Sequence, residues 1–292
     1  MKRALAVLGA IVMIAVSIAI RHGIDDNGSS SSTPSGPVRI TCIPELEAQC
    51  RALTGVTVEI EEADVTARKI AAGSAVIDGW VTFDPWPTMT ALLAQHDVVK
   101  KTTAIVASDL AIAMVRERAE ALAPSCGGTV TWKCLGDANG RQWVDVGGQA
   151  AWGAVKVGLP TSSATRALLL ANAATSYFGR TDFATNDFDD QFRVWRTNLL
   201  ASPGTFDEFL QFFPAKFSAV GVVSPLADPG VRKNEVAFFD SGVATVVVSD
   251  VTGRGGRVID DLQQALEKAG WGDLRAASLP DPGVLLALSG LG

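Results

Sequence analysis

The chain has 292 residues, of which 48% are hydrophobic and 19% are charged, and its formal net charge is −6. This length and apolar content suffice for one large domain or two smaller ones, each with a sizeable core. No basic run exceeds a pair such as Lys100–Lys101, and neutralising phosphates needs clustered lysine and arginine, so we expect no nucleic-acid partner.

The first 23 residues are typical of a segment that directs export. Basic residues follow the initiator methionine, residues 4–20 are uncharged and mostly aliphatic, and Arg21 closes the run. A small-residue cleavage site is poorly matched here, so residues 1–23 favour a signal anchor slightly over a cleaved signal peptide. Either would place the remainder outside the cytoplasm, membrane-anchored or secreted. Residues 24–37 are rich in Gly, Ser and Pro and predict a flexible linker.

From residue 38 onward, strand-like segments alternate with helix-like ones. The predicted strands and extended runs are 37–43, 56–63, a part of 75–86, 102–118, 154–160, 218–227 and 243–251. The predicted helices are 44–55, 64–73, 88–96, 162–179, 189–201, 206–216, 256–270 and 280–290. This alternation indicates an α/β fold whose mostly parallel sheet is covered on both faces. In such sheets, ligands bind beyond the carboxyl ends of the strands.

Hydroxyl side chains gather where the strand at 154–160 gives way to a long helix. Ser162, Ser163 and Thr165 lie at the first turn of this helix. One hydroxyl is enough to cap a helix. A helix N-terminus also offers free amides and a positive dipole end to a bound ligand. From these residues alone, capping and ligand binding are both open, with capping favoured.

Five segments together resemble a known family. They are CIPEL, DGWVTFDPW, VASDLAIAMVRE, TWKCLGD and VGLPTSSATRALLLANAA. Their order resembles the type II periplasmic-binding-protein superfamily, the bacterial extracellular solute-binding proteins, in its actinobacterial form. The resemblance implies two α/β lobes joined by a two-segment hinge, which close on a ligand. Lobe 1 would comprise residues 38–107 and 243–292, and lobe 2 residues 108–242.

The resemblance also implies where the ligand binds. The helices that begin at Pro44 and at Ser162 would point their N-termini into the cleft from opposite lobes, which now favours ligand binding over capping. The expected ligand-binding residues are Pro44, Glu45, Asp84, Trp86, Ser108, Ser162, Ser163, Thr165 and Ser224. A structural role is the alternative for several of them: a turn for Asp84, Ser108 and Ser224, and the core for Trp86. Glu45 complements a helix dipole, and its charge makes a small dianion an unfavourable ligand.

Four cysteines suit an oxidising compartment. They are Cys42, Cys50, Cys126 and Cys134, and three pairings are open to them. Zinc is a weaker alternative because no C-x-x-C motif occurs and the chain has 2 histidines, so we expect no metal. The resemblance favours pairing Cys42 with Cys50 and Cys126 with Cys134, because any other pairing would tether the two lobes across a moving cleft.

Catalytic motifs are lacking in this sequence. It contains no G-x-S-x-G elbow, no H-E-x-x-H and no phosphate-binding P-loop, so we expect neither a catalytic residue nor a cofactor. The expected function is capture of a small polar ligand, with an ABC-type transporter permease as the receiving partner and the membrane contacted through the N-terminal segment. The alternative is a membrane-anchored sensory or interaction module that has the same fold and no transport role.

Overall fold

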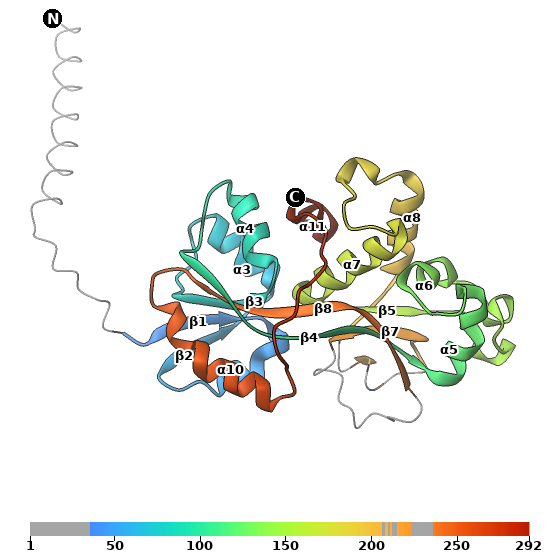
Figure 1. Ribbon diagram of the computed structural model, residues 1–292, viewed down its shortest axis with the longest axis horizontal. Helices are drawn as coiled ribbons and strands as arrows, with labels where there is room; N and C mark the ends of the chain where they lie inside the picture. The colour runs from blue at the N-terminus through green and yellow to red at the C-terminus, as the bar shows by residue number, and fades with distance from the viewer. Residues whose placement is uncertain (1–35, 206–207, 210, 212–214, 224–235, 292) are drawn as a thin grey trace, which may run out of the picture. The chain divides into compact units, whose positions relative to one another are not determined.

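The computed structural model describes residues 36–205, 208–209, 211, 215–223 and 236–291 (Figure 1). The predicted anchor at 1–23, nearly all of the linker, most of the helix predicted at 206–216 and the candidate residue Ser224 lie outside them. Among the described helices, none combines the length and the apolar character that crossing a bilayer would require.

The described residues between Val38 and Leu291 build a mixed α/β structure, which confirms the predicted class. The strands are β1 (Val38–Cys42), β2 (Val56–Ile60), β3 (Gly79–Phe83), β4 (Lys101–Val115), β5 (Val157–Pro160), β6 (Ser202–Gly204), β7 (Ala219–Val223) and β8 (Val236–Asp250). The α-helices are α2 (Glu47–Arg51), α3 (Ala63–Ala71), α4 (Trp86–Ala94), α5 (Arg116–Leu122), α6 (Trp132–Ala138), α7 (Ser163–Phe178), α8 (Asp190–Leu199), α10 (Ile259–Lys268) and α11 (Pro282–Ser289), and a 3-10 turn, η1 (Pro44–Leu46), precedes α2.

The eight described strands form one sheet in the order β2-β1-β3-β8-β4-β7-β5-β6. β1 pairs in parallel with β2 and β3, and β5 pairs in parallel with β6 and β7. β8 adds antiparallel to β3, and β4 adds antiparallel to β7. From one edge the order is therefore β2-β1-β3-β8-β4, and from the other edge it is β6-β5-β7-β4-β8. Each half of the sheet repeats the topology of the other.

The two long strands, β4 and β8, belong to both halves. Each has 15 residues, and they pair antiparallel through the middle of the sheet (Figure 1). The register shifts between Ala104 and Val106 and again between Leu110 and Ala111, so the ladder is interrupted on both sides of Ser108. Such bulges add local twist and bend to a strand pair.

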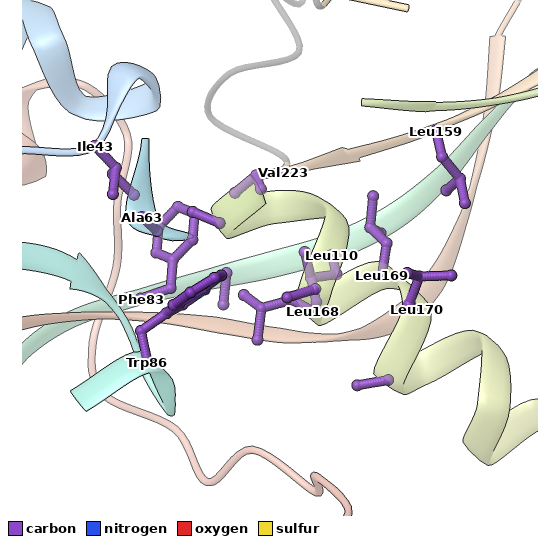
Figure 2. Packing of buried hydrophobic residues seen from close by; sticks show 14 of the residues in the cluster. Ile43, Ala63, Phe83, Trp86, Leu110, Leu159, Leu168, Leu169, Leu170 and Val223 are labelled. Carbon is purple, nitrogen blue, oxygen red and sulfur yellow. The ribbon is translucent and has the colours of Figure 1, made fainter. Parts of the chain in front are cut away.

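α7 is the central helix of the core. Its alanine and leucine side chains are almost all buried, and it packs against α3, α11 and β3 as well as β5 and β7. Figure 2 shows Leu168 of α7 directed toward Phe83 and Trp86, and Leu169 on the side of Leu159. A helix that is apolar around nearly all of its circumference must be buried on most sides. α7 therefore contacts both halves of the sheet, and its N-terminus lies where the two halves meet.

Several boundaries differ from the predictions. The extended run predicted at 102–118 ends at Val115, where α5 begins, and the strand predicted at 243–251 begins earlier, as β8 at Val236. β6 was not predicted, because its sequence, Ser-Pro-Gly, is typical of a turn. As an edge strand paired only with β5 among the described strands, it tolerates proline.

Both cysteine pairs are local. Disulfides join Cys42 to Cys50 and Cys126 to Cys134, with Cα–Cα distances of 6.6 and 5.4 Å. A straight helix would separate residues eight apart by about 12 Å, beyond disulfide reach. The first pair closes because Cys42 ends β1 and Cys50 lies in α2, so the chain reverses direction between them.

Candidate ligand-binding site

A pocket of about 370 Å³ lies at the carboxyl ends of strands from both halves of the sheet. Pro44 and Glu45 reach it from the segment after β1, and Glu62 reaches it from the segment after β2. The other half contributes the residues between β5 and α7, Thr205 after β6, and the end of β7. This is the place where an open α/β sheet binds its ligands.

The first turn of α7 binds a carboxylate from the opposite half of the sheet. Glu45 Oε1 accepts hydrogen bonds from the Ser162 hydroxyl, from the Thr165 hydroxyl at 2.6 Å and from the Thr165 amide at 3.0 Å. Ser162 is the N-cap residue, yet its side chain makes no hydrogen bond to its own helix. The interpretation that Ser162 caps α7 is therefore wrong, because Glu45 accepts the hydrogen bond from the Thr165 amide at this helix end.

A second carboxylate binds beside the first. Glu62 Oε2 accepts the Ser163 amide at 2.8 Å and the Ser163 hydroxyl at 2.9 Å, and the same hydroxyl accepts the Asp64 amide at 3.2 Å. Negative groups are stabilised at a helix N-terminus by the dipole and by the free amides. The hydroxyls at 162, 163 and 165 thus hold the chain's own carboxylates.

The two oxygens of Glu45 differ in their surroundings. Oε1 has three donors, whereas Oε2 is buried and has no hydrogen-bond partner among the described residues. Burial raises the pKa of Glu45, and the hydrogen bonds from Ser162 and Thr165 lower it by less. Glu45, a residue of the pocket lining, therefore has one buried carboxyl oxygen without a hydrogen-bond partner among the described residues.

The other predicted residues are divided between the pocket and the core. Pro44, Glu45, Ser162 and Thr165 line the pocket, and Ser163 adjoins it through Glu62. Trp86 is 1% exposed and packs in the core beside Phe83 at the start of α4 (Figure 2). The 3-10 turn that begins at Pro44 and the first turn of α7 therefore lie at the same pocket, and Trp86 does not contribute to it.

Asp84 and Ser108 are not among the pocket-lining residues. Asp84 lies between β3 and α4, where its amide donates to the Thr245 carbonyl at 2.9 Å and burial raises the pKa of its side chain. Ser108 is buried within β4, opposite Ala244 of β8.

Five contributors to the pocket were not predicted from the sequence: Glu62, Pro160, Thr161, Thr205 and the end of β7. The sequence did contain a signal for Glu62, since an acidic pair, Glu61 and Glu62, lies at the carboxyl end of the second predicted strand, where ligands bind. Thr205 follows β6, which was itself not predicted. Among the described residues, no group of three or more His, Cys, Asp or Glu side chains is arranged to hold a metal ion.

No protein-family model and no curated protein matches the chain. Similar solved structures include a hydrogen-peroxide-bound mutant of OxyR from Corynebacterium glutamicum, with a TM-score of 0.46 and 11% identity over 90% of this chain and 74% of that chain. A variant OxyR2 regulatory domain from Vibrio vulnificus has a TM-score of 0.47 and 10% identity, over 80% of this chain and 97% of that chain. The substrate-binding domain of a molybdenum ABC transporter from Clostridium difficile has a TM-score of 0.43 and 11% identity, over 82% of this chain and 99% of that chain. Neither ligand nor role follows from likenesses at this level.

Proposed function

We propose that the described part of the chain is a two-lobe solute-binding domain of the type II periplasmic-binding-protein kind. Lobe 1 comprises residues 38–107 and 243–292, and lobe 2 residues 108–242. The repeated strand order supports this division, because each half has the same topology and contains both long strands. The hinge would pass through β4 near Ser108 and through β8 near Gly242, where the ladder is irregular and φ of Gly242 is +133°.

The pocket is the observation that carries this function. It lies at the carboxyl ends of strands from both lobes, and its volume of about 370 Å³ suits a small molecule. Hydroxyl and carboxyl groups line it together with prolines and valines, so its ligand is small and polar with some carbon surface. We assign this site a binding role and no catalytic one.

An extracytoplasmic location completes the proposal, with the chain membrane-anchored or secreted and an ABC-type permease as its partner. Two disulfides support an oxidising compartment. A sensory module with the same fold is the second candidate. It is favoured by the hydrogen bonds of Glu45 and Glu62 to α7, which link the two proposed lobes directly.

A thermal-shift screen of amino acids, sugars, anions, peptides and amines tests the binding role. A ligand at one hundred times its Kd stabilises the native state by about 2.7 kcal/mol, so a true ligand raises the Tm by several degrees. Thr165→Val should weaken binding of that ligand. Thr197→Val, at an exposed position of α8, should leave the affinity unchanged. A library in which no compound raises the Tm would contradict the proposal.

Uptake separates the two candidate roles once a ligand is identified. If the protein delivers ligand to a permease, deleting its gene abolishes uptake of that ligand by intact cells, and plasmid-borne protein restores it. Unchanged uptake in the deletion strain would instead support the sensory role.

A further inference from the structure

The charge of the described pocket lining opposes an anionic ligand. Glu45 and Glu62 both line it, and the described lining residues include no lysine, arginine or histidine. The positive end of α7 would attract an anion, but the two carboxylates already occupy the Ser163 and Thr165 amides. An anion would therefore meet two negative groups while those two helix amides are already engaged.

Glu45 Oε2 has no hydrogen-bond donor among the described residues. Oε2 is buried in a residue that lines the pocket, and a buried carboxylate oxygen without a hydrogen bond is unfavourable. Oε1 already accepts from Ser162 and Thr165 at the N-terminus of a 16-residue helix, an arrangement that favours the charged form of the group. Burial acts the other way and raises the pKa of Glu45. A cation in the pocket, close to the Glu45 carboxyl group, would offset that burial.

The remaining walls suit a short carbon chain. Pro44, Pro160, Val222 and Val223 line the same pocket and present apolar surface, while Thr161 and Thr205 add hydroxyls. A ligand with a charged end and an aliphatic body would satisfy both kinds of wall.

We propose that the ligand is a small aliphatic amine whose ammonium group binds beside the carboxylates of Glu45 and Glu62. This assignment rests on the proposed function, since it names the ligand class of the same pocket. Glu62 adds a second negative group to the pocket and strengthens the preference for a cation.

Matched compounds test the charge preference in the native protein. The probes are 1,4-diaminobutane, 1,4-butanediol and succinate, which share a four-carbon chain, together with the corresponding two-, three- and five-carbon sets. We expect at least one amine to raise the Tm and to give a saturable isotherm in titration calorimetry. The matching diol and dicarboxylate should bind at least about tenfold more weakly, because a charge-assisted hydrogen bond is lost or a repulsion is gained.

A pair of variants tests the role of Glu45. Glu45→Gln keeps an oxygen for the Ser162 and Thr165 donors but removes the negative charge, and it should weaken the amine at least about tenfold. Glu47→Gln is the matched control, because Glu47 is an exposed neighbour paired with Arg51, and it should leave the affinity unchanged. If Glu45→Gln does not fold, the matched compounds still decide the charge preference.

The outcomes separate this inference from the proposed function. Binding of a dicarboxylate or a diol in preference to every amine would overturn the ligand class and leave the binding role standing. Amines that bind Glu45→Gln as tightly as the native protein would overturn the assignment to Glu45. If neither these probes nor the wider screen yields any ligand, both proposals fail.

Discussion

The segments that follow β1 and β5 occupy the same place in the two halves of the sheet and carry opposite chemistry. After β1 the chain forms a short 3-10 turn that presents Glu45 as an acceptor. After β5 it forms the long helix α7, whose first turn presents the donors of Ser162 and Thr165. The repeated topology thus places an acceptor opposite donors. The two halves therefore differ in what they supply to a shared set of hydrogen bonds: the half with β1 supplies the acceptor, and the half with β5 supplies the donors.

The disulfides sharpen this comparison and carry the largest expected effect. Cys42–Cys50 closes the segment that presents Glu45, whereas Cys126 and Cys134 contribute to a different pocket near α6. Replacing both cysteines of either pair with alanine should lower the free energy of unfolding by about 2–4 kcal/mol, measured by urea denaturation. Only the loss of Cys42–Cys50 should also weaken ligand binding to the pocket. Equal binding by the two double variants would show that the first disulfide does not position Glu45.

Gly242 tests the strand that connects the two halves. Its φ of +133° is rarely adopted by other residues, and a Cβ there would lie 2.3 Å from Asn172 Oδ1 of α7. Gly242→Ala should therefore lower the free energy of unfolding by about 1–3 kcal/mol. Gly290→Ala, at φ +75° with open space around its Cβ, is the control for a positive φ without a side-chain contact. Equal losses in the two variants would mean that the contact with Asn172 adds nothing.

Thr165 tests the donor side of the shared hydrogen bonds. Thr165→Val removes the hydroxyl that donates to Glu45 and retains the amide, so the free energy of unfolding should fall by about 1–2 kcal/mol. In a double-mutant cycle with Glu45→Gln the two effects should not add, because both changes act on one interaction. Thr197→Val, at an exposed position of α8, should change stability by less than about 0.5 kcal/mol. Full additivity in the cycle would exclude coupling between Thr165 and Glu45.

The sequence predicts what is local and misses what depends on distant contacts. Periodicity indicates β1, β3 and α7, because buried strands and an apolar helix leave continuous signals. The hydroxyls at the start of α7 are also visible, but their partner is not. Ser162 and Glu45 are 117 positions apart, and no local pattern specifies that pairing. β6 escapes for a related reason, since its three residues form a strand only by pairing with β5.

Trp86 shows the same limit in the core. Its position after Asp84-Pro85 at the end of a strand fits both a cleft and a buried site. The choice is made by packing: α4 lies against α3 and α11, and Trp86 faces the interior beside α7 (Figure 2). Exposure of an aromatic residue at a strand end therefore depends on which helices cover that end, and these come from elsewhere in the chain.

The smallest expected effect concerns pH and the acceptor side. Burial raises the pKa of Glu45 above its ordinary value of 4.5, so the folded state binds the proton more tightly than the unfolded state does. Stability from this group is therefore fully present below the unfolded pKa and is lost as pH rises through the folded pKa. The free energy of unfolding of the native protein, relative to Glu45→Gln, should decrease with rising pH above about 4.5 and then level off. Urea denaturation of both proteins across that range measures the difference, and Glu47→Gln should run parallel to the native protein. A bound amine should make this decrease smaller, because a cation close to the Glu45 carboxyl group lowers the pKa that burial has raised. A difference that increases with pH would mean that the donors of α7 outweigh burial, and that Glu45 is held ionised without any ligand.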